Sequence, residues 1–378
     1  MEIFDLKIDI LSLVLLGTFI LSLLIQLFYY LCFYMRVPVF KGYKEKAGKL
    51  PVSVIICAKN EAENLRKNLP TILEQDYSEY EVVVVDDCSS DDTELVLRQF
   101  KEKYPRLKTT QIKQDDKFSH GKKLALTIGI KAATYEWLVM TDADCYVKSK
   151  MWLANIEQNF TDDAQVVLGY GKYEPRKGFL DKIIRYDTFF IALQYFSFAR
   201  AGVPYMGVGR NLAYRKSLFF KNRGFATHAQ VLSGDDDLFI NEVAKKSNTR
   251  IEISPESHTY SIPEESFNDW TNQKKRHFTT SKFYKTKHKV LLGLEVVSRS
   301  LFYISFALLL CFKVFLLYVI GAFILRLILQ FTIFKNSMKH LGEKKLLLFS
   351  LLLDIFMPYI QLSIILVNSV TSNRNRWK

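Results

Sequence analysis

Two aspartates, Asp142 and Asp144, come directly after a short apolar run at residues 137–140. Such a run predicts a buried strand, and in open α/β sheets ligands bind beyond the carboxyl ends of the strands. Two carboxylates one residue apart at that edge can together bind Mn²⁺ or Mg²⁺, which in turn binds phosphate oxygens. An Asp-x-Asp triplet alone is usually a solvated turn, but its position after a strand favours a metal site. Asp142 and Asp144 are therefore the candidate metal ligands.

A second acidic pair, Asp86 and Asp87, follows the continuous apolar run Val82 to Val85. Carboxylates at this strand end can accept hydrogen bonds from a nucleobase or a ribose. The alternative explanation is that they cap the next helix, but Asp91 or Asp92 is better placed for that purpose. Asp86 and Asp87 are therefore candidates for nucleotide binding.

Two further positions lie between a predicted strand and a predicted helix. Asn60 and Glu61 close the first strand-like run and open a helical pattern. Lys122 follows His120 and Gly121 at the start of another helix, where backbone N–H groups and a lysine together suit a pyrophosphate. A solvated lysine is the alternative, and the glycine spacing is not that of a Walker loop.

Three consecutive acids, Asp235 to Asp237, follow Gly234 at the start of a predicted helix. The helix dipole favours acids at this position and explains one or two of them. The functional interpretation is that one of these carboxylates is a general base that deprotonates a hydroxyl group.

Gln273, Arg276 and His277 have the spacing i, i+3 and i+4, so on a helix they share one face. Arg276 can bind phosphate oxygens through two hydrogen bonds, and His277 can add a donor. A basic helix beside a membrane is the alternative. It accounts for Lys274 and Lys275 but explains Gln273 poorly.

The elements that must position these side chains lie between residues 51 and 262, where β-branched runs alternate with helical patterns. This alternation predicts βαβ units and a mostly parallel sheet covered by helices on both faces. The predicted strands are Val52–Cys57, Glu81–Asp86, Lys108–Lys113, Trp137–Thr141 and Gln165–Leu168. One helical stripe comprises Leu65, Leu69, Ile72 and Leu73, and a second comprises Leu97, Phe100 and Tyr104.

Apolar residues concentrate at the two ends of the chain. Residues 8–34 are long enough to cross roughly 30 Å of hydrocarbon, and the acidic start before them is unlike a signal peptide. Basic residues follow and predict a cytoplasmic location for the downstream side: Arg36, Lys41, Lys44 and Lys46.

Residues 290–370 are apolar again and have room for two or three spans, with a tight turn near Lys313. The basic loop at 335–345 and the basic tail at 374–378 cannot both be cytoplasmic if one span separates them. We therefore expect an anchor at residues 1–36, a cytoplasmic α/β domain with a juxtamembrane helix at 37–289, and a membrane region at 290–378.

The composition agrees with a membrane protein. The chain has 378 residues, a formal net charge of +13 and 49% hydrophobic residues. Because much of the positive charge flanks the apolar segments, we expect membrane lipids and no nucleic acid as partners. The five cysteines form no CxxC pair, which argues against a disulfide framework and a structural zinc site.

In their order along the chain, these motifs resemble the membrane-integrated family-2 glycosyltransferases with a GT-A fold. That branch includes the cellulose, chitin and hyaluronan synthases and the ceramide glucosyltransferases. The resemblance covers residues 51 to about 285. The segments that carry it are Val52–Ile56 with Asn60–Glu61, Asp86–Ser89, Gly121–Lys122, Asp142–Asp144, Gly207–Asn211, Gly234–Asp236 and Gln273–His277.

The resemblance implies a nucleotide-sugar donor, with UDP as the expected carrier, a divalent metal, and inversion at the anomeric carbon of the sugar. It implies Asp236 as the base, supported by Asp235. The implied donor-binding residues are Asn60, Glu61, Asp86, Asp87, Lys122, Asp142, Gln273, Arg276 and His277. His277 stands where the QxxRW signature of the family has tryptophan. This departure argues against processive polymer synthesis and favours a transferase that adds one sugar to a lipid acceptor, while a saccharide acceptor stays open.

Three other functions stay open at this point: a processive polysaccharide synthase, a membrane nucleotidyltransferase that releases pyrophosphate, and a non-catalytic nucleotide-binding membrane scaffold. Acid clusters at strand or helix ends argue against the scaffold, which does not require them. We expect a multi-pass protein of the cell (inner) membrane. The sequence makes no prediction of the oligomeric state.

Overall fold

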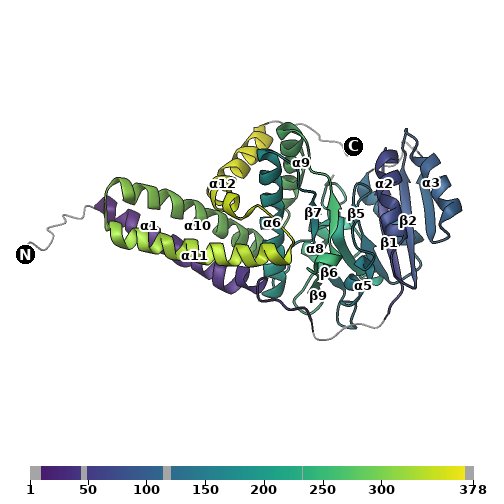
Figure 1. The fold of residues 1–378 in the computed structure, drawn as a ribbon, viewed down its shortest axis with the longest axis horizontal. Coiled ribbons are helices and arrows are strands. Elements are labelled where there is room, and N and C mark those ends of the chain that lie inside the picture. Colours follow the sequence, from purple (N-terminus) through teal and green to yellow (C-terminus); the bar gives the residue numbers. More distant parts are fainter. Residues whose placement is uncertain (1–9, 44–48, 114–120, 232, 371–378) are drawn as a thin grey trace, which may run out of the picture.

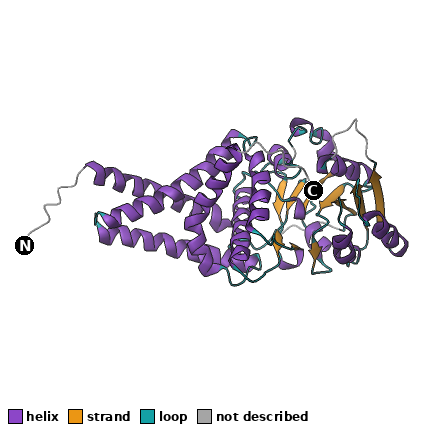
Figure 2. Cartoon of the chain, turned by 90° about the horizontal axis from the view of Figure 1, so that it is seen from above, coloured by secondary structure: helices purple, strands orange, loops and turns teal. Residues whose placement is uncertain are grey.

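The computed structural model describes residues 10–43, 49–113, 121–231 and 233–370. Figure 1 shows a helical bundle at one end of the molecule and an α/β domain at the other. Figure 2 shows the same division from above, with all strands gathered at the end away from the bundle. Several residues named in the sequence interpretation lie outside the described residues: Lys44, Lys46, His120 and the tail 374–378.

The α/β domain is built on a seven-stranded sheet with the order β3-β2-β1-β4-β8-β6-β9. β1 pairs in parallel with β2 and β4, and β8 is antiparallel to both of its neighbours. The strand bounds are β1 Val52–Ala58, β2 Tyr80–Asp87, β3 Leu107–Ile112, β4 Trp137–Met140, β6 Val166–Leu168, β8 Leu212–Arg215 and β9 Thr249–Ile251. The mostly parallel sheet expected from the sequence is therefore confirmed, and all five expected strands are present.

Helices cover both faces of the sheet because alternate side chains of its central strands point in opposite directions. Val52, Val54 and Ile56 belong to one apolar core, shared with α2 Ala62–Leu73 and α3 Thr93–Lys103. Ile55 belongs to the other core, shared with α4 Lys122–Ala132. The second helical stripe is shorter than expected, since α3 ends at Lys103 and Tyr104 follows it.

The α4 helix lies unusually close to the sheet. A Cβ atom on Gly129 would approach Cγ2 of Ile55 to 2.8 Å and Cγ2 of Val85 to 3.0 Å. A larger side chain would therefore push the helix away from the strands. This contact fixes the start of α4, where Lys122 lies.

A smaller sheet connects the main sheet to the membrane helices. Its strands are β5 Tyr146–Val147, β7 Gly171–Tyr173 and β10 Thr259–Ser261, in the order β5-β10-β7. The remaining helices of the domain are α5 Trp152–Glu157, α6 Phe179–Arg200, α7 Lys216–Lys221, α8 Asp237–Val243 and α9 Phe267–Ser281. In Figure 1, α6 and α9 stand between the sheets and the bundle.

Within the described residues, four helices are long and apolar enough to cross a membrane. They are α1 Ile10–Phe28, which continues through one π turn and one 3₁₀ turn to Arg36, α10 Thr286–Cys311, α11 Leu316–His340 and α12 Leu347–Val370. One span is thus N-terminal and three are C-terminal. The predicted turn near Lys313 is present, and α10 begins four residues before the expected start at Val290.

The helices α1, α10 and α11 run side by side, whereas α12 lies at the base of the bundle, beside α6 and α9 (Figure 1). Two arginines and two acids, all buried, join these helices. Arg299 Nη1 lies 2.9 Å from Asp354 Oδ1, and Arg326 Nη2 lies 3.1 Å from Asp354 Oδ2. Arg299 Nη2 also lies 3.4 Å from Glu295 Oε2. We call these four residues the bundle cluster.

The loop between α11 and α12 is bound directly to the α/β domain. Arg185 of α6 donates a 2.6 Å hydrogen bond to Glu343 in this loop, and Tyr170 donates one of 3.0 Å. Lys172 donates to the carbonyl oxygen of Gly342 at 2.8 Å. The two parts of the molecule are therefore joined by buried polar contacts as well as by the chain itself.

Candidate active site

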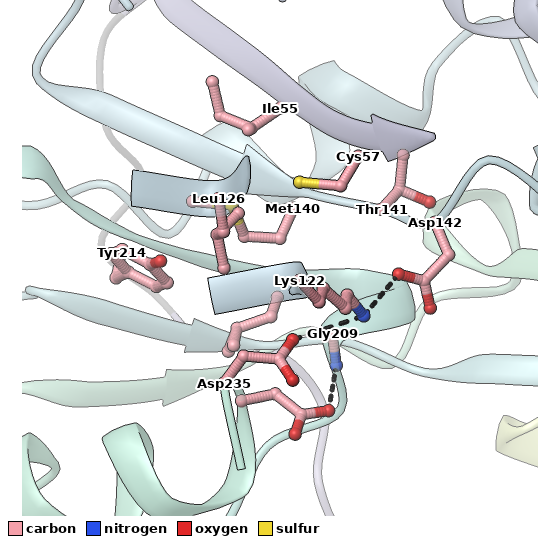
Figure 3. A pocket seen from close by; sticks show the side chains of 12 residues that line it. Ile55, Cys57, Lys122, Leu126, Met140, Thr141, Asp142, Gly209, Tyr214 and Asp235 are labelled. Carbon is pink, nitrogen blue, oxygen red and sulfur yellow. Dashed lines mark hydrogen bonds and ion pairs between the residues drawn. The ribbon is translucent and has the colours of Figure 1, made fainter. Parts of the chain in front are cut away.

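The acids predicted from separate segments meet at the carboxyl edge of the main sheet. Lys122, at the first position of α4, lies between two of them, with Nζ 2.8 Å from Asp142 Oδ1 and 3.2 Å from Asp235 Oδ2 (Figure 3). Burial lowers the pKa of Lys122, but Asp142, Asp235 and Asp236 raise it more, so its pKa lies above the ordinary value. Lys122 therefore stays a cation and connects the strand-end acids to those at the start of α8.

Asp236 is the N-cap residue of α8 and faces the same space. Its Oδ2 accepts a 2.7 Å hydrogen bond from the backbone N–H of Gly209, and its Oδ1 accepts one of 2.7 Å from the backbone N–H of Asp237. Burial, followed by the charges of Asp235 and Asp237, raises the pKa of Asp236 to about 7. A carboxylate with a pKa near neutral pH suits proton transfer as a general base.

The third acid of this run has a different environment. Asp237 Oδ2 accepts hydrogen bonds from Thr280 at 2.5 Å and from Tyr284 at 2.7 Å, while Oδ1 accepts from the N–H of Leu238. These contacts bind the start of α8 to the end of α9. Asp237 therefore holds two elements of the site together.

The residues Asp142 and Asp144 fit a divalent cation. Their carboxylate oxygens and the thiol of Cys145 lie within 4.8 Å of one another. Burial and the nearby Asp142 raise the pKa of Asp144, and a cation bound between the two carboxylates would offset both effects. Oxygen ligands suit Mg²⁺ or Mn²⁺, so the two carboxylates are the expected ligands. The thiol of the buried Cys145 instead lies 3.5 Å from a carboxylate oxygen of Asp144.

A large cavity of about 690 Å³ contains these groups and the predicted face of α9. Gln273, Arg276 and His277 all line it, as do Asp144 and Asp236. The shared face expected from their spacing is therefore present, while their role in donor binding stays a prediction.

The neighbour of that face, Lys274, is not part of a solvated basic helix. It is only 7% exposed and forms an ion pair with Asp187 of α6. The interpretation of Lys274 as a juxtamembrane surface residue is therefore wrong, because the helix turns this side chain into the protein.

Arg210 is a site residue that the sequence interpretation did not single out. Its guanidinium lies 4.3 Å from the ring centroid of Tyr173 and donates a 3.0 Å hydrogen bond to Ser261. It lines the cavity and is a nearby positive charge for Asp144. Its position directly after Gly209, in a segment already noted for its resemblance, is the signal that could have identified it.

The remaining predicted donor residues gather around the turns after β1 and β2. Asn60 Oδ1 accepts a 2.8 Å hydrogen bond from the N–H of Ser90, and Asp86 Oδ1 accepts one of 3.1 Å from Ser89. The buried Oδ2 atom of Asp86 has no hydrogen-bond partner among the described residues. An orphaned buried oxygen of this kind suits a donor from a ligand.

Asp87 is fully buried in the same turn. Glu61 lies close enough to the candidate metal ligands Asp142 and Asp144 to interact with their charges. Burial raises the pKa of Glu61, and the charges of Asp144 and Asp142 add to this rise. None of the residues Asn60, Glu61, Asp86 and Asp87 is among those that line the 690 Å³ cavity. The candidate site thus has two parts, a turn cluster and the cavity, with Glu61 near their boundary.

Comparison with known proteins agrees with this geometry. Residues 53–221 match the family model described as Glycosyl transferase family 2. A poly-β-1,6-N-acetyl-D-glucosamine synthase of Staphylococcus epidermidis is 32% identical over 101 residues, which are 25% of this chain and 22% of that protein. The Bacillus subtilis protein named "Probable glycosyltransferase YdaM" is 27% identical over 261 residues, 66% of this chain and 59% of that protein. The matches thus span less than two thirds of either relative.

Among solved structures, the chain is similar to the mannosyltransferase PcManGT of Pyrobaculum calidifontis, in complex with GDP-Man and Mn²⁺. The TM-score is 0.58 and the sequence identity 20%, and the match covers 92% of this chain and 99% of that chain. At this identity the likeness shows the fold. The GT-A fold with membrane helices expected from the sequence is confirmed.

Proposed function

Because this chain carries a glycosyltransferase family 2 domain at residues 53–221, we propose that it transfers a sugar from a nucleotide-sugar to an acceptor hydroxyl beside a membrane. One observation carries the proposal. Lys122 lies between Asp142 and Asp235, and these groups share a cavity with Asp236 and Arg276. A candidate base, candidate metal ligands and phosphate-binding cations are thus within one space.

The oxygen of the acceptor hydroxyl attacks the anomeric carbon of the sugar, and Asp236 receives the proton of that hydroxyl. The bond from that carbon to the diphosphate oxygen breaks, and the nucleoside diphosphate leaves with the electron pair. One displacement of this kind inverts the anomeric configuration. The hydrogen bonds from Gly209 and Asp237 hold the carboxylate of Asp236 in place for this step.

Lys122 and Arg276 stabilise the negative charge that grows on the departing diphosphate. Asp235 keeps the ammonium of Lys122 in position through its 3.2 Å ion pair. When bound, Mn²⁺ or Mg²⁺ at Asp142 and Asp144 would add positive charge beside the same diphosphate oxygens.

In this proposal the nucleoside occupies the turn cluster. The orphaned Oδ2 of Asp86 accepts a hydrogen bond from the base or ribose, and Asn60, Glu61 and Asp87 shape that end of the site. UDP is the carrier that we expect from the sequence motifs, and GDP is the one in the PcManGT complex. A test of donor binding should therefore include both UDP-sugars and GDP-sugars.

The proposed location is the cytoplasmic face of the cell membrane. Four candidate membrane helices and the arginine at the end of the first one, Arg36, support it. In this orientation the nucleotide-sugar comes from the cytoplasm.

The purified full chain should be tested with a panel of UDP- and GDP-sugars and Mn²⁺ or Mg²⁺, with released nucleoside diphosphate as the readout. Release with one donor supports the proposal, and release of pyrophosphate instead would indicate a nucleotidyltransferase. Product length separates single transfer from polymer synthesis, the activity in the name of the Staphylococcus epidermidis relative. Failure of every donor with both metals would overturn the proposal.

A further inference from the structure

The 690 Å³ cavity extends from the catalytic acids to the membrane helices. Its far wall includes Ile184 and Ile191 of α6, Leu292 and Val296 of α10, and Gln361 of α12. α10 and α12 are both candidate membrane spans. One space therefore connects the proposed chemistry with the part of the molecule that lies in lipid.

The two ends of this cavity differ in polarity. The near end is lined by charged groups such as Lys122, Asp144 and Asp236, whereas the far wall combines aliphatic side chains with uncharged polar ones, among them Thr188 and Gln194 of α6.

Several polar side chains along this wall already have partners within the protein. Gln194 donates a 3.3 Å hydrogen bond to Tyr34. Lys274 pairs with Asp187, and Gln361 donates a 2.9 Å hydrogen bond to the same carboxylate.

A saccharide chain along the far wall would need hydrogen-bonding partners there, since its hydroxyl groups lose water on entry. This wall offers few, and the groups of Lys274 and Gln361 already bind Asp187. A hydrocarbon chain needs none and gains free energy from contact with Ile191, Leu292 and Val296.

The α10 helix, a candidate membrane span, contacts this cavity with one face and turns another face outward. Leu292 and Val296, four residues apart, face the cavity. Leu294 and Val297 point outward and are 41% and 54% exposed. Only the width of this helix separates the cavity wall from the bilayer.

We propose that the acceptor is a membrane lipid with a hydroxylated head group. Its hydrocarbon chain lies along the wall of α6, α10 and α12, and its head reaches Asp236. This inference rests on the proposed sugar transfer, whose acceptor it specifies.

The first test measures lipid occupancy without any reaction. The full chain is reconstituted in phosphatidylcholine vesicles that contain diacylglycerol with a photoreactive diazirine near the end of one acyl chain. After illumination, mass spectrometry maps the adducts. Adducts on Ile191, Leu292 or Val296 support the inference, whereas adducts confined to outward residues such as Leu294 and Val297 overturn it. Because no substitution is involved, misfolding cannot produce either result.

The second test uses a matched pair of variants. Val296→Trp fills the cavity, and Val297→Trp adds the same volume to the outward face of the same helix. Transfer is measured as labelled sugar that enters the organic phase, with total membrane lipids as acceptors. We expect Val296→Trp to lower lipid product by about tenfold or more, and Val297→Trp to change it less than about twofold. Equal effects of the two variants would count against the lipid path.

The readouts separate the inference from the proposed function. Release of nucleoside diphosphate to water, without an acceptor, reports the function alone, and the outward variant Val297→Trp should leave this release unchanged. If a water-soluble saccharide is glycosylated and the cavity gives no lipid adducts, the transferase function stands and the lipid acceptor is wrong. If the cavity binds lipid but no donor is cleaved, the lipid site stands and the transferase function fails.

Discussion

The acids around Lys122 and the bundle cluster both hold charged side chains away from bulk water, and they differ in their balance of charge. In the bundle cluster two arginines face two acids, and Asp354 accepts from both Arg299 and Arg326. In the candidate active site, five aspartates lie close to three cations, Lys122, Lys123 and Arg210: Asp142, Asp144, Asp235, Asp236 and Asp237.

This difference indicates which cluster has its charges balanced within the protein and which one has room for an added cation. Buried ion pairs with their charges matched act mainly within the protein, because removing one partner leaves the other unpaired. A cluster with surplus acids is costly by itself and is stabilised by an added cation or by protons. The raised pKa values of Asp144 and Asp236 agree with that reading. The matched charges of the bundle cluster fit a role in holding the fold, whereas the surplus acids are what the proposed binding of a metal and the proposed chemistry require.

The largest expected effect separates chemistry from stability. Asp236→Asn should lower turnover by about 10² to 10⁴, the usual contribution of a general base, because the amide cannot accept the proton. Nucleotide affinity should stay close to that of the unchanged chain, and the unfolding temperature should not fall, because the ionised Asp236 carboxylate itself costs stability at neutral pH. Release of nucleoside diphosphate and thermal unfolding measure the two. Asp163→Asn, at an exposed position, is the matched control, and near-normal turnover of Asp236→Asn would remove this residue from the mechanism.

The opposite result is expected for the bundle cluster. Asp354→Asn leaves Arg299 and Arg326 without their shared carboxylate and should lower the free energy of unfolding by about 3 to 5 kcal/mol. Thermal unfolding in detergent measures this loss. An unfolding temperature unchanged from that of the parent chain would show that the cluster does not hold the helices together.

Metal should sharpen the contrast, since only the acid cluster has surplus negative charge. Mn²⁺ at about 100 times its dissociation constant should stabilise the chain by about 2.7 kcal/mol, and a chelator should reverse the effect. Asp144→Asn should lose this response and be more stable than the parent without metal, because one repulsive charge is gone. Thermal unfolding with and without metal is the measurement, and an unaltered response in Asp144→Asn would exclude this residue as a ligand.

The smallest effect is a dependence on pH. The folded-state pKa of Asp236 is raised from 3.8 to about 7, so its base form is lost as pH falls through 7. Turnover at pH 6 should therefore be roughly tenfold lower than the maximal turnover reached well above pH 7. Between pH 4 and 7 the folded state holds a proton that the unfolded state has lost. The contribution of this group to stability therefore falls as pH rises through that window, by at most about 1.4 kcal/mol per pH unit.

Asp236→Asn should remove the part of the pH dependence of stability that comes from this group, since asparagine does not titrate. Unfolding temperatures measured across the window for both chains provide the comparison. If the unfolding temperature changed with pH by the same amount in both chains, the raised pKa would not belong to Asp236.

Much of the fold could be predicted because local patterns determine it. Val82 to Val85 form a continuous apolar run, as a strand buried on both faces requires, and the membrane helices are identified by length and apolarity. β8 was missed because Leu212–Arg215 is short and mixed in polarity. α6 was missed for another reason. This helix is buried nearly all round, so it lacks the apolar stripe that reveals an amphipathic helix.

The candidate site shows the same limit. Acids that follow strands, such as Asp142 and Asp144, could be placed at the sheet edge from sequence because parallel strands end there together. The environments of Asp237 and Lys274 could not, since their partners Thr280 and Asp187 lie 43 and 87 residues away in the chain. Contacts of that kind depend on how α6, α8 and α9 pack, which residue spacing does not encode.

The hydrogen bonds from Thr280 and Tyr284 to Asp237 also tie the start of α8 to the segment that leads into α10, a candidate membrane span. Tyr284 lies two residues before α10 enters its span, and Asp237 is adjacent to Asp236. The proposed proton acceptor is thus held at a constant height above that span by a short, rigid connection. In the proposed transfer, such a connection would act as a molecular ruler, which would select acceptors by the distance from their buried tail to their reactive hydroxyl.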